Sequence, residues 1–166
     1  MTGRLGSEPP PEPAGAKLRD SVLRTPPGEL GFVSDSQFPD IYGVLVDWSL
    51  GDVVASILAL RDGSASLYTT STFGVIGGGG HEAVRAAARH CVHVAADCLA
   101  LSQAVTDFPL PTGDDAYLHL LTYAGVRRCV ADLDDLSDGG DPASLLFEAA
   151  QEVLTQLRET VEDGPG

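Results

Sequence analysis

The sequence predicts an α+β fold in which helices pack on an antiparallel five-stranded sheet. Three observations predict it: strand-like apolar runs follow one another without intervening helices, two segments carry apolar residues at helical spacing, and turn signals separate the neighbouring strand candidates. The predicted order is β-β-β-α-β-β-α. A chain of 166 residues falls within the size range of one domain and can bury a substantial core.

The first half of the chain supplies three predicted strands. Residues 40–48 and 52–63 are short, apolar and rich in β-branched side chains, and the turn at 49–51 separates them. The second strand has apolar side chains on both faces, which is typical of a central strand covered on both sides. Asp62-Gly63 is a hairpin signal, and it leads into a third, more exposed strand over residues 64–76.

A helix is predicted over residues 81–101, where small apolar residues recur every three or four positions. These residues are Val84, Ala87, Ala88, Cys91, Ala95, Cys98 and Leu99. Such a narrow face lets a helix lie close to a sheet or to a second copy of the chain.

The second half continues with two strands and a helix. Residues 116–123 and 126–133 form a hairpin joined at Ala124-Gly125, and an acidic turn follows. The last helix is predicted over residues 142–160, with Asp141 as N-cap and Pro142 at its first position.

The domain itself is predicted over residues 38–162, between an N-terminal leader and a flexible C-terminus at 163–166. Residues 1–37 are rich in proline and poor in large apolar side chains, so the leader is predicted to be mostly disordered. Within it, residues 16–25 can form two helical turns, which are marginal in water unless they pack on the domain.

The charge balance excludes some classes of partner. The chain has 24 acidic against 10 basic residues and a formal charge of −14, which disfavours nucleic acids and anionic membranes as partners. An acidic surface suits a basic or apolar patch on another protein, although solvation alone also explains it. The start of the chain has no signal-peptide pattern, and the three cysteines have no metal-type or redox-type spacing, so a cytoplasmic location is predicted.

The segment FGVIGGGGHEAVRAAARH, residues 73–90, raises the question of a ligand. Glycines that lead into a helix N-terminus can bind an anion, but they also make a tight corner between a strand and a helix. The P-loop pattern fails because no lysine follows the last glycine. The dinucleotide fingerprint fails because its third glycine is replaced by Glu82 and the loop follows a meander of strands. No cofactor is therefore predicted.

A small-anion site remains possible at this corner. Basic residues spaced by four start at the helix N-terminus and form a stripe over His81, Arg85, Arg89 and His93. The hypothesis assigns a carboxylate or phosphate to Gly77, Gly78, Gly79, Gly80, His81, Arg85 and Arg89. The competing interpretation is that the arginines form surface ion pairs with Glu82 and the acidic loops.

No metal site is predicted. The segment HCVHVAADC offers His90, Cys91, His93 and Cys98, but Cys91 belongs to the apolar face while the histidines point away from it. The aspartates of residues 132–141 lack the glycine that an EF-hand loop requires.

No catalytic residue is predicted either. The chain has no GxSxG motif, and a serine, a histidine and an aspartate make a triad only through their geometry. Asp47 lies in an apolar strand beside a turn, so we expect it to face water. His119 is expected to be a partly buried histidine with its polar atoms satisfied.

The runs YGVLVDW, GVIGGGGHEAVR, LLTYAGV and SLLFEAAQEVLTQLR resemble a family of uncharacterised bacterial proteins of this size, over most of residues 40–160. That resemblance implies no activity. At the level of the fold, the order of elements and the small acidic chain are similar to type III secretion chaperones. Those proteins dimerise and bind segments of other proteins.

Two functions are predicted. The first is a non-enzymatic protein-binding or regulatory module, chaperone-like, that forms a homodimer and binds its partner through the sheet or a helix face. The alternative is a small-ligand protein or enzyme that uses residues 77–80 and the following helix N-terminus.

Overall fold

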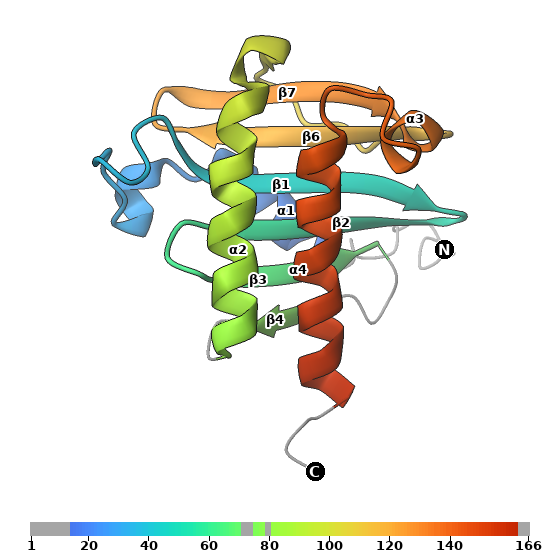
Figure 1. Ribbon diagram of the computed structural model, residues 1–166, viewed down its shortest axis with the longest axis horizontal. Coiled ribbons are helices and arrows are strands. Elements are labelled where there is room, and N and C mark those ends of the chain that lie inside the picture. The colour runs from blue at the N-terminus through green and yellow to red at the C-terminus, as the bar shows by residue number, and fades with distance from the viewer. Residues whose placement is uncertain (1–13, 71–74, 79–80, 163–166) are drawn as a thin grey trace, which may run out of the picture.

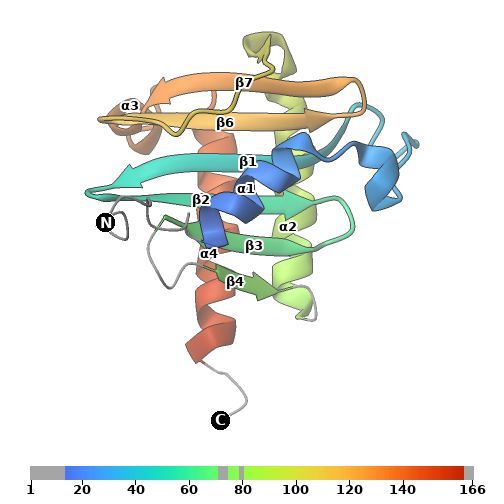
Figure 2. The ribbon, with the colours of Figure 1, turned by 180° about the vertical axis from the view of Figure 1, so that it is seen from behind.

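The computed structural model describes residues 14–70, 75–78 and 81–162. It has three layers, with an antiparallel sheet between two helices on one face and a single helix on the other (Figure 1, Figure 2). Helices α2 (Glu82–Ala95) and α4 (Ser144–Glu162) lie side by side and cross the strands, while α1 (Ala14–Arg24) lies behind the sheet. The predicted α+β class is confirmed.

The sheet has strand order β4-β3-β2-β1-β6-β7-β5 among the described residues, rather than five strands. Its strands are β1 (Ile41–Leu50), β2 (Val53–Leu60), β3 (Ala65–Thr69), β4 (Val75–Gly78), β5 (Gln103–Ala104), β6 (Asp115–Thr122) and β7 (Gly125–Asp132). All pairings are antiparallel, and β1 is central because it pairs with β2 on one side and β6 on the other.

The two additional strands have local causes. The third predicted strand, residues 64–76, covers β3 and the first two residues of β4, and β4 pairs antiparallel with β3. Strand β5 has only two residues, and it pairs with Arg127 and Arg128 at the opposite edge of the sheet. Short edge strands give weak sequence signals because their periodicity covers too few residues.

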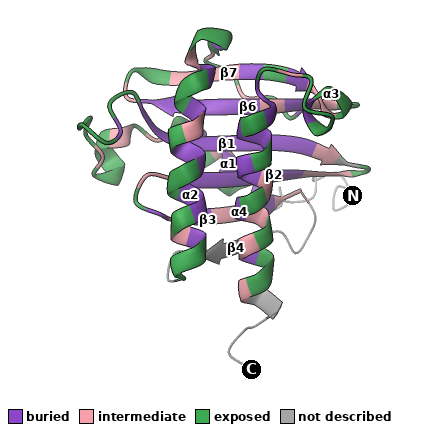
Figure 3. Cartoon of the chain, viewed as in Figure 1, coloured by how far each residue is buried: buried purple, intermediate pink, exposed green. Residues whose placement is uncertain are grey.

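Strand β1 divides the interior into two clusters because its side chains alternate between the faces of the sheet, and the irregular register between Ile41 and Gly43 shifts this alternation at Tyr42. Val44, Val46 and Trp48 belong to the main core under α2 and α4, while Tyr42 and Leu45 belong to a smaller cluster with Leu23 of α1. Figure 3 shows the buried residues gathered on the strands and on the inner sides of the helices. Both faces of the central strands are therefore covered, as predicted for the second strand.

The small-residue face of α2 is used within the chain. Six residues of this helix are buried: Val84, Ala87, Ala88, Cys91, Val92 and Ala95. They belong to the main core, together with Ala149, Ala150 and Val153 of α4. The small-residue face of α2 is therefore filled by contacts within the chain, and no contact with a second copy is needed to explain it.

The helix ends differ slightly from the prediction. The α-helix predicted to reach residue 101 tightens after Ala95 into the 3-10 helix η3 (Ala96–Leu101). A short helix α3 (Leu133–Ser137) occupies part of the acidic turn, because the Asp132 carboxylate accepts hydrogen bonds from the N–H groups of Asp134 and Asp135. The Asp141 carboxylate accepts a hydrogen bond from the N–H of Ala143, and α4 begins at Ser144 rather than at the predicted Pro142.

The leader differs most from the prediction of a mostly disordered segment over residues 1–37. Residues 1–13 lie outside the described part of the chain. Ala14–Arg24 form α1, packed across the back of the sheet (Figure 2), which confirms the helical turns that the sequence allows over residues 16–25. The 3-10 helix η2 (Pro27–Leu30) and Phe38, which is buried in the main core, complete the path to β1. Composition alone misses this packing because α1 uses a charged side chain as its anchor. Residues 163–166 lie outside the described part.

Candidate functional site

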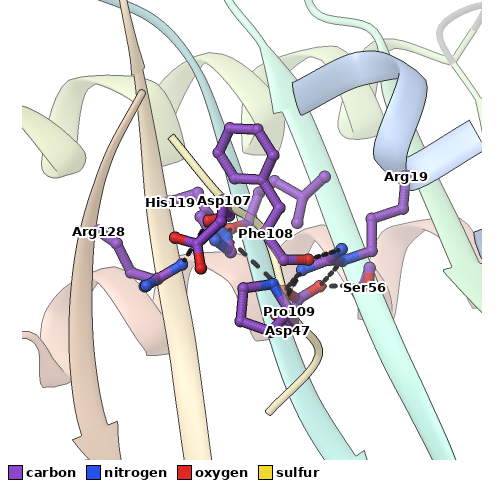
Figure 4. A network of polar contacts seen from close by, with 9 residues as sticks. Arg19, Asp47, Ser56, Asp107, Phe108, Pro109, His119 and Arg128 are labelled. Carbon is purple, nitrogen blue, oxygen red and sulfur yellow. Dashed lines mark hydrogen bonds and ion pairs between the residues drawn. The ribbon is translucent and has the colours of Figure 1, made fainter. Parts of the chain in front are cut away.

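A cluster of buried polar side chains lies between α1 and the sheet (Figure 4). It consists of Arg19 from α1, Asp47 from β1, Ser56 from β2 and His119 from β6, and we call it the Arg19 cluster. The four residues are at most 4 % exposed. Charged side chains are rarely buried to this extent unless they are paired, so the cluster is a candidate site.

Strand register brings the sheet residues together. Asp47 is directly opposite Ser56 in the β1–β2 pairing, and His119 is opposite Leu45 in the β1–β6 pairing. Asp47, two residues after Leu45, therefore points to the same face of the sheet. The last member, Arg19, arrives from α1 and lies 28 positions away from Asp47 along the chain.

Arg19 and Asp47 form a bidentate ion pair. Arg19 Nε donates to Asp47 Oδ1 at 2.9 Å and Nη2 donates to Oδ2 at 2.7 Å. The same guanidinium donates to the backbone carbonyl oxygens of Phe108 at 2.9 Å and Pro109 at 3.2 Å. One side chain thus joins α1, the central strand and the loop before β6.

His119 is neutral in this environment. Its Nδ1 lies 3.2 Å from the carbonyl oxygen of Leu45 and 3.7 Å from Asp47 Oδ2, whereas Nε2 is buried with no hydrogen-bond partner among the described residues. Burial lowers the pKa of His119 to about 4, and the nearby Asp47 carboxylate opposes that shift only partly. We infer that the neutral ring donates from Nδ1 to Leu45.

The cluster contains the residue types of a Ser-His-Asp triad in a different arrangement. In a triad, histidine accepts from the serine and donates to the aspartate. Here Ser56 Oγ donates to Asp47 Oδ1, and Arg19 occupies both oxygens of that carboxylate. The arrangement fixes α1 to the sheet, and a serine nucleophile activated by His119 does not follow from it.

Two expectations for single residues are corrected here. Asp47 was expected to face water, but it is fully buried because Arg19 supplies its counterion from a distant part of the chain. His119 was expected to be partly buried and satisfied, but it is fully buried and its Nε2 has no partner in the described part of the structure. Neither change has a signal in the local sequence, because both depend on where α1 packs.

The structure describes only part of the site that was predicted to bind an anion. Gly77 and Gly78 belong to β4, where they pair with Ser66 and Ala65, and residues 79–80 lie outside the described part. His81 is exposed at the N-cap of α2 and makes no side-chain cap hydrogen bond.

The two arginines of the predicted site lie one turn apart on α2 and have different surroundings. Arg85 Nη2 donates to Glu82 at 2.7 Å, as the ion-pair interpretation expected. Arg89 is exposed one turn further along α2 and lines a surface pocket with Arg61 and His93. We call this the Arg61 pocket. Arg61 follows directly after β2, and its sequence environment gives no sign of a site.

Further searches concern metal ions and membranes. Within residues 14–70, 75–78 and 81–162, no three His, Cys, Asp or Glu side chains are placed to hold a metal ion. No helix in that part of the chain has the length and apolar character needed to span a membrane. Cys91, Cys98 and Cys129 are buried, free thiols.

Comparison with known protein families, curated proteins and solved structures finds no match for this chain. The resemblance to bacterial proteins and to type III secretion chaperones therefore stays a prediction.

Proposed function

We propose that this protein is a non-enzymatic protein-binding module whose binding surface is the sheet face that α1 covers. The observation that carries the proposal is that α1 is held by one buried stripe, Gly15, Arg19 and Leu23, anchored on Asp47. Leu18, on the same helix, stays 43 % exposed. A short helix attached in this way is stabilised mainly by its tertiary contacts. A partner segment that offers the same contacts can therefore replace it.

The chemistry of the surface defines the partner. The Asp47 carboxylate lies on the covered face, where it pairs with Arg19, and Leu45, Leu58 and Tyr68 of the smaller cluster lie on the same face. A segment that fits presents an arginine with an apolar side chain one helical turn away, as Arg19 and Leu23 do. The chain's charge of −14 also favours the approach of basic segments.

A second copy of the chain carries the same helix, so exchange of α1 between two copies is the form of homodimer that this surface permits. The proposal keeps the chaperone-like role, in which a folded module holds a segment of another protein. Three free buried cysteines suit the reducing cytoplasm that we propose as its location.

The test starts from the full chain with Arg19→Ala. Without Arg19, the buried Asp47 carboxylate has no counterion, which is energetically costly. Detachment of α1 lets water reach this carboxylate and so lowers the cost. We expect hydrogen-exchange protection of the amides of residues 19–23 to fall at least about a hundredfold, while the amides of β1 and β6 stay protected. A fluorescent peptide of residues 14–25, which stands in for the partner, should then bind the variant at least about tenfold more tightly than the wild type.

Two controls make the result specific. Lys17→Ala removes an equal charge from the exposed side of α1 and should leave both exchange and peptide binding at wild-type values. A peptide in which glutamine replaces Arg19 should not bind. The proposal fails if the Arg19→Ala chain keeps its sheet protected, loses α1 protection and still binds no peptide, or if α1 stays protected.

A further inference from the structure

The Arg61 pocket is a second feature, which does not depend on the role of α1. It has a volume of about 600 Å³ and lies where the segment before β1, the turn after β2 and the middle of α2 meet. Phe32 and Phe38 supply aromatic walls, and Arg61, Arg89 and His93 supply nitrogen donors. The volume falls in the range typical of small-molecule sites.

Arg61 is held in a fixed position in this pocket. Its guanidinium carbon lies 5.1 Å from the ring centroid of Phe38 and 5.7 Å from that of Phe32. Nη1 donates to the Val33 carbonyl oxygen and to the Tyr123 hydroxyl, both at 2.6 Å, and Nη2 pairs with Asp35. The side chain is therefore oriented before any ligand arrives, which lowers the entropic cost of binding.

Arg89 and His93 are the donors without competing partners. The Arg89 side chain has no hydrogen bond or ion pair with any residue that the structure describes. The His93 ring stacks on Phe38 with centroids 4.5 Å apart and an angle of 18°, a contact that leaves its nitrogen atoms free. Both lie on the exposed side of α2, one turn apart.

The acidic residues nearby are already engaged. Asp35 pairs with Arg61 and accepts the backbone N–H groups of Gln37 and Phe38, and the Phe38 N–H lowers the pKa of Asp35. Asp62 accepts the backbone N–H of Ser64 at 2.9 Å. Asp35 is neutralised by Arg61, and Asp62 forms no ion pair with Arg89, so the Arg89 guanidinium keeps its N–H donors for a ligand.

We propose that the Arg61 pocket binds a small oxyanion, a carboxylate or phosphate group, with Arg89 as its main charge partner. Arg61 and His93 contribute further N–H donors, and Phe32 and Phe38 contact the apolar part of the ligand. Arginine suits this role because its planar fork of N–H groups matches both kinds of oxyanion. The sequence predicted an anion site at residues 77–81, Arg85 and Arg89, and of these residues the Arg61 pocket contains only Arg89.

The experiment is a titration of the full chain followed by two-dimensional amide NMR. Inorganic phosphate, phenyl phosphate and benzoate are the probes, because they separate the two oxyanions and test the aromatic walls. We expect saturable shifts at the amides of residues 31–38, 61–62 and 89–93, with the two aromatic probes binding more tightly than phosphate. Arg89→Gln should weaken binding about tenfold.

Arg158→Gln is the matched control, since Arg158 is an exposed arginine on α4 and its removal changes the net charge equally. This variant should bind as the wild type does. The proposal is overturned if no probe gives saturable shifts at millimolar concentration, if Arg89→Gln binds like Arg158→Gln, or if the shifts centre on residues 77–82.

Discussion

At the scale of single residues, the structure shows how a distant partner changes the environment of an ionisable group. Asp47 and His119 are both fully buried because Arg19 and the loop at Phe108 and Pro109 close over them. The cost of burying the Asp47 carboxylate is offset by three hydrogen bonds, two from Arg19 and one from Ser56. The histidine instead avoids the cost by staying neutral.

The neutral state of His119 predicts a dependence of stability on pH. Its pKa is about 4 in the folded protein and 6.5 in an ordinary environment. Between these values the unfolded chain binds a proton at His119 and the folded chain does not, so the free energy of unfolding falls as pH falls from 6.5 to 4. The full effect is about 3 kcal/mol.

Urea unfolding of wild type and His119→Leu at pH 4.5 to 7.5 measures this contribution. We expect the variant to lose less stability than the wild type on acidification, and the two curves to run parallel above pH 7. His90→Gln, an exposed histidine on α2, is the control and should follow the wild type at every pH. Parallel curves for wild type and His119→Leu across the whole range would contradict the assignment.

At the scale of the elements, the sheet depends on one close approach in its central strand. A Cβ on Gly43 of β1 would lie 2.7 Å from Leu60 Cδ2, 3.0 Å from Leu121 Cδ1 and 3.2 Å from the backbone oxygen of Ala59. Its position coincides with an irregularity in the β1–β6 register. We expect Gly43→Ala to destabilise the fold by about 1–3 kcal/mol through overpacking.

The control for this change is Gly28→Ala, because no atom lies within 4 Å of the added Cβ there. Its free energy of unfolding should stay within about 0.5 kcal/mol of the wild type. Chemical denaturation followed by tryptophan fluorescence reports on the right region, since Trp48 lies on the same strand as Gly43. Equal midpoints for the two variants would show that the neighbours of Gly43 move aside at little cost.

Elements with strong periodicity were predictable from the sequence, and those defined by tertiary contacts were not. The apolar alternation of β1 and β2 and the helical spacing of α2 give these elements and their buried faces directly. The docking of α1 depends on Arg19, which composition counts as a solvated charge. The Arg61 pocket could not be predicted either, because its arginines and aromatic side chains come from three segments that only the tertiary fold brings together.

At the scale of the whole molecule, the two hydrophobic clusters lie on opposite faces of the sheet, so α1 can detach from one face while the main core on the other face stays folded. All three cysteines belong to the main core under α2 and α4, whereas the α1 side chain Leu23 belongs to the cluster on the other face. We therefore expect detachment of α1 to leave the thiols buried, and global unfolding to be needed to expose them. Thiol reactivity and exchange at α1 thus measure two different processes.

The thiols should react only in the unfolded chain. Burial raises the pKa of Cys91 to about 12 and that of Cys98 to about 11, which suppresses the reactive thiolate as well as access to it. We expect native wild type and Arg19→Ala to be equally unreactive toward Ellman's reagent, and all three thiols to become reactive together at the urea midpoint. Thr155→Cys, an exposed position on α4, should react at once and verifies the reagent. If Arg19→Ala instead exposes its cysteines under native conditions, then α1 is part of one cooperative unit with the main core and cannot be exchanged for a partner segment.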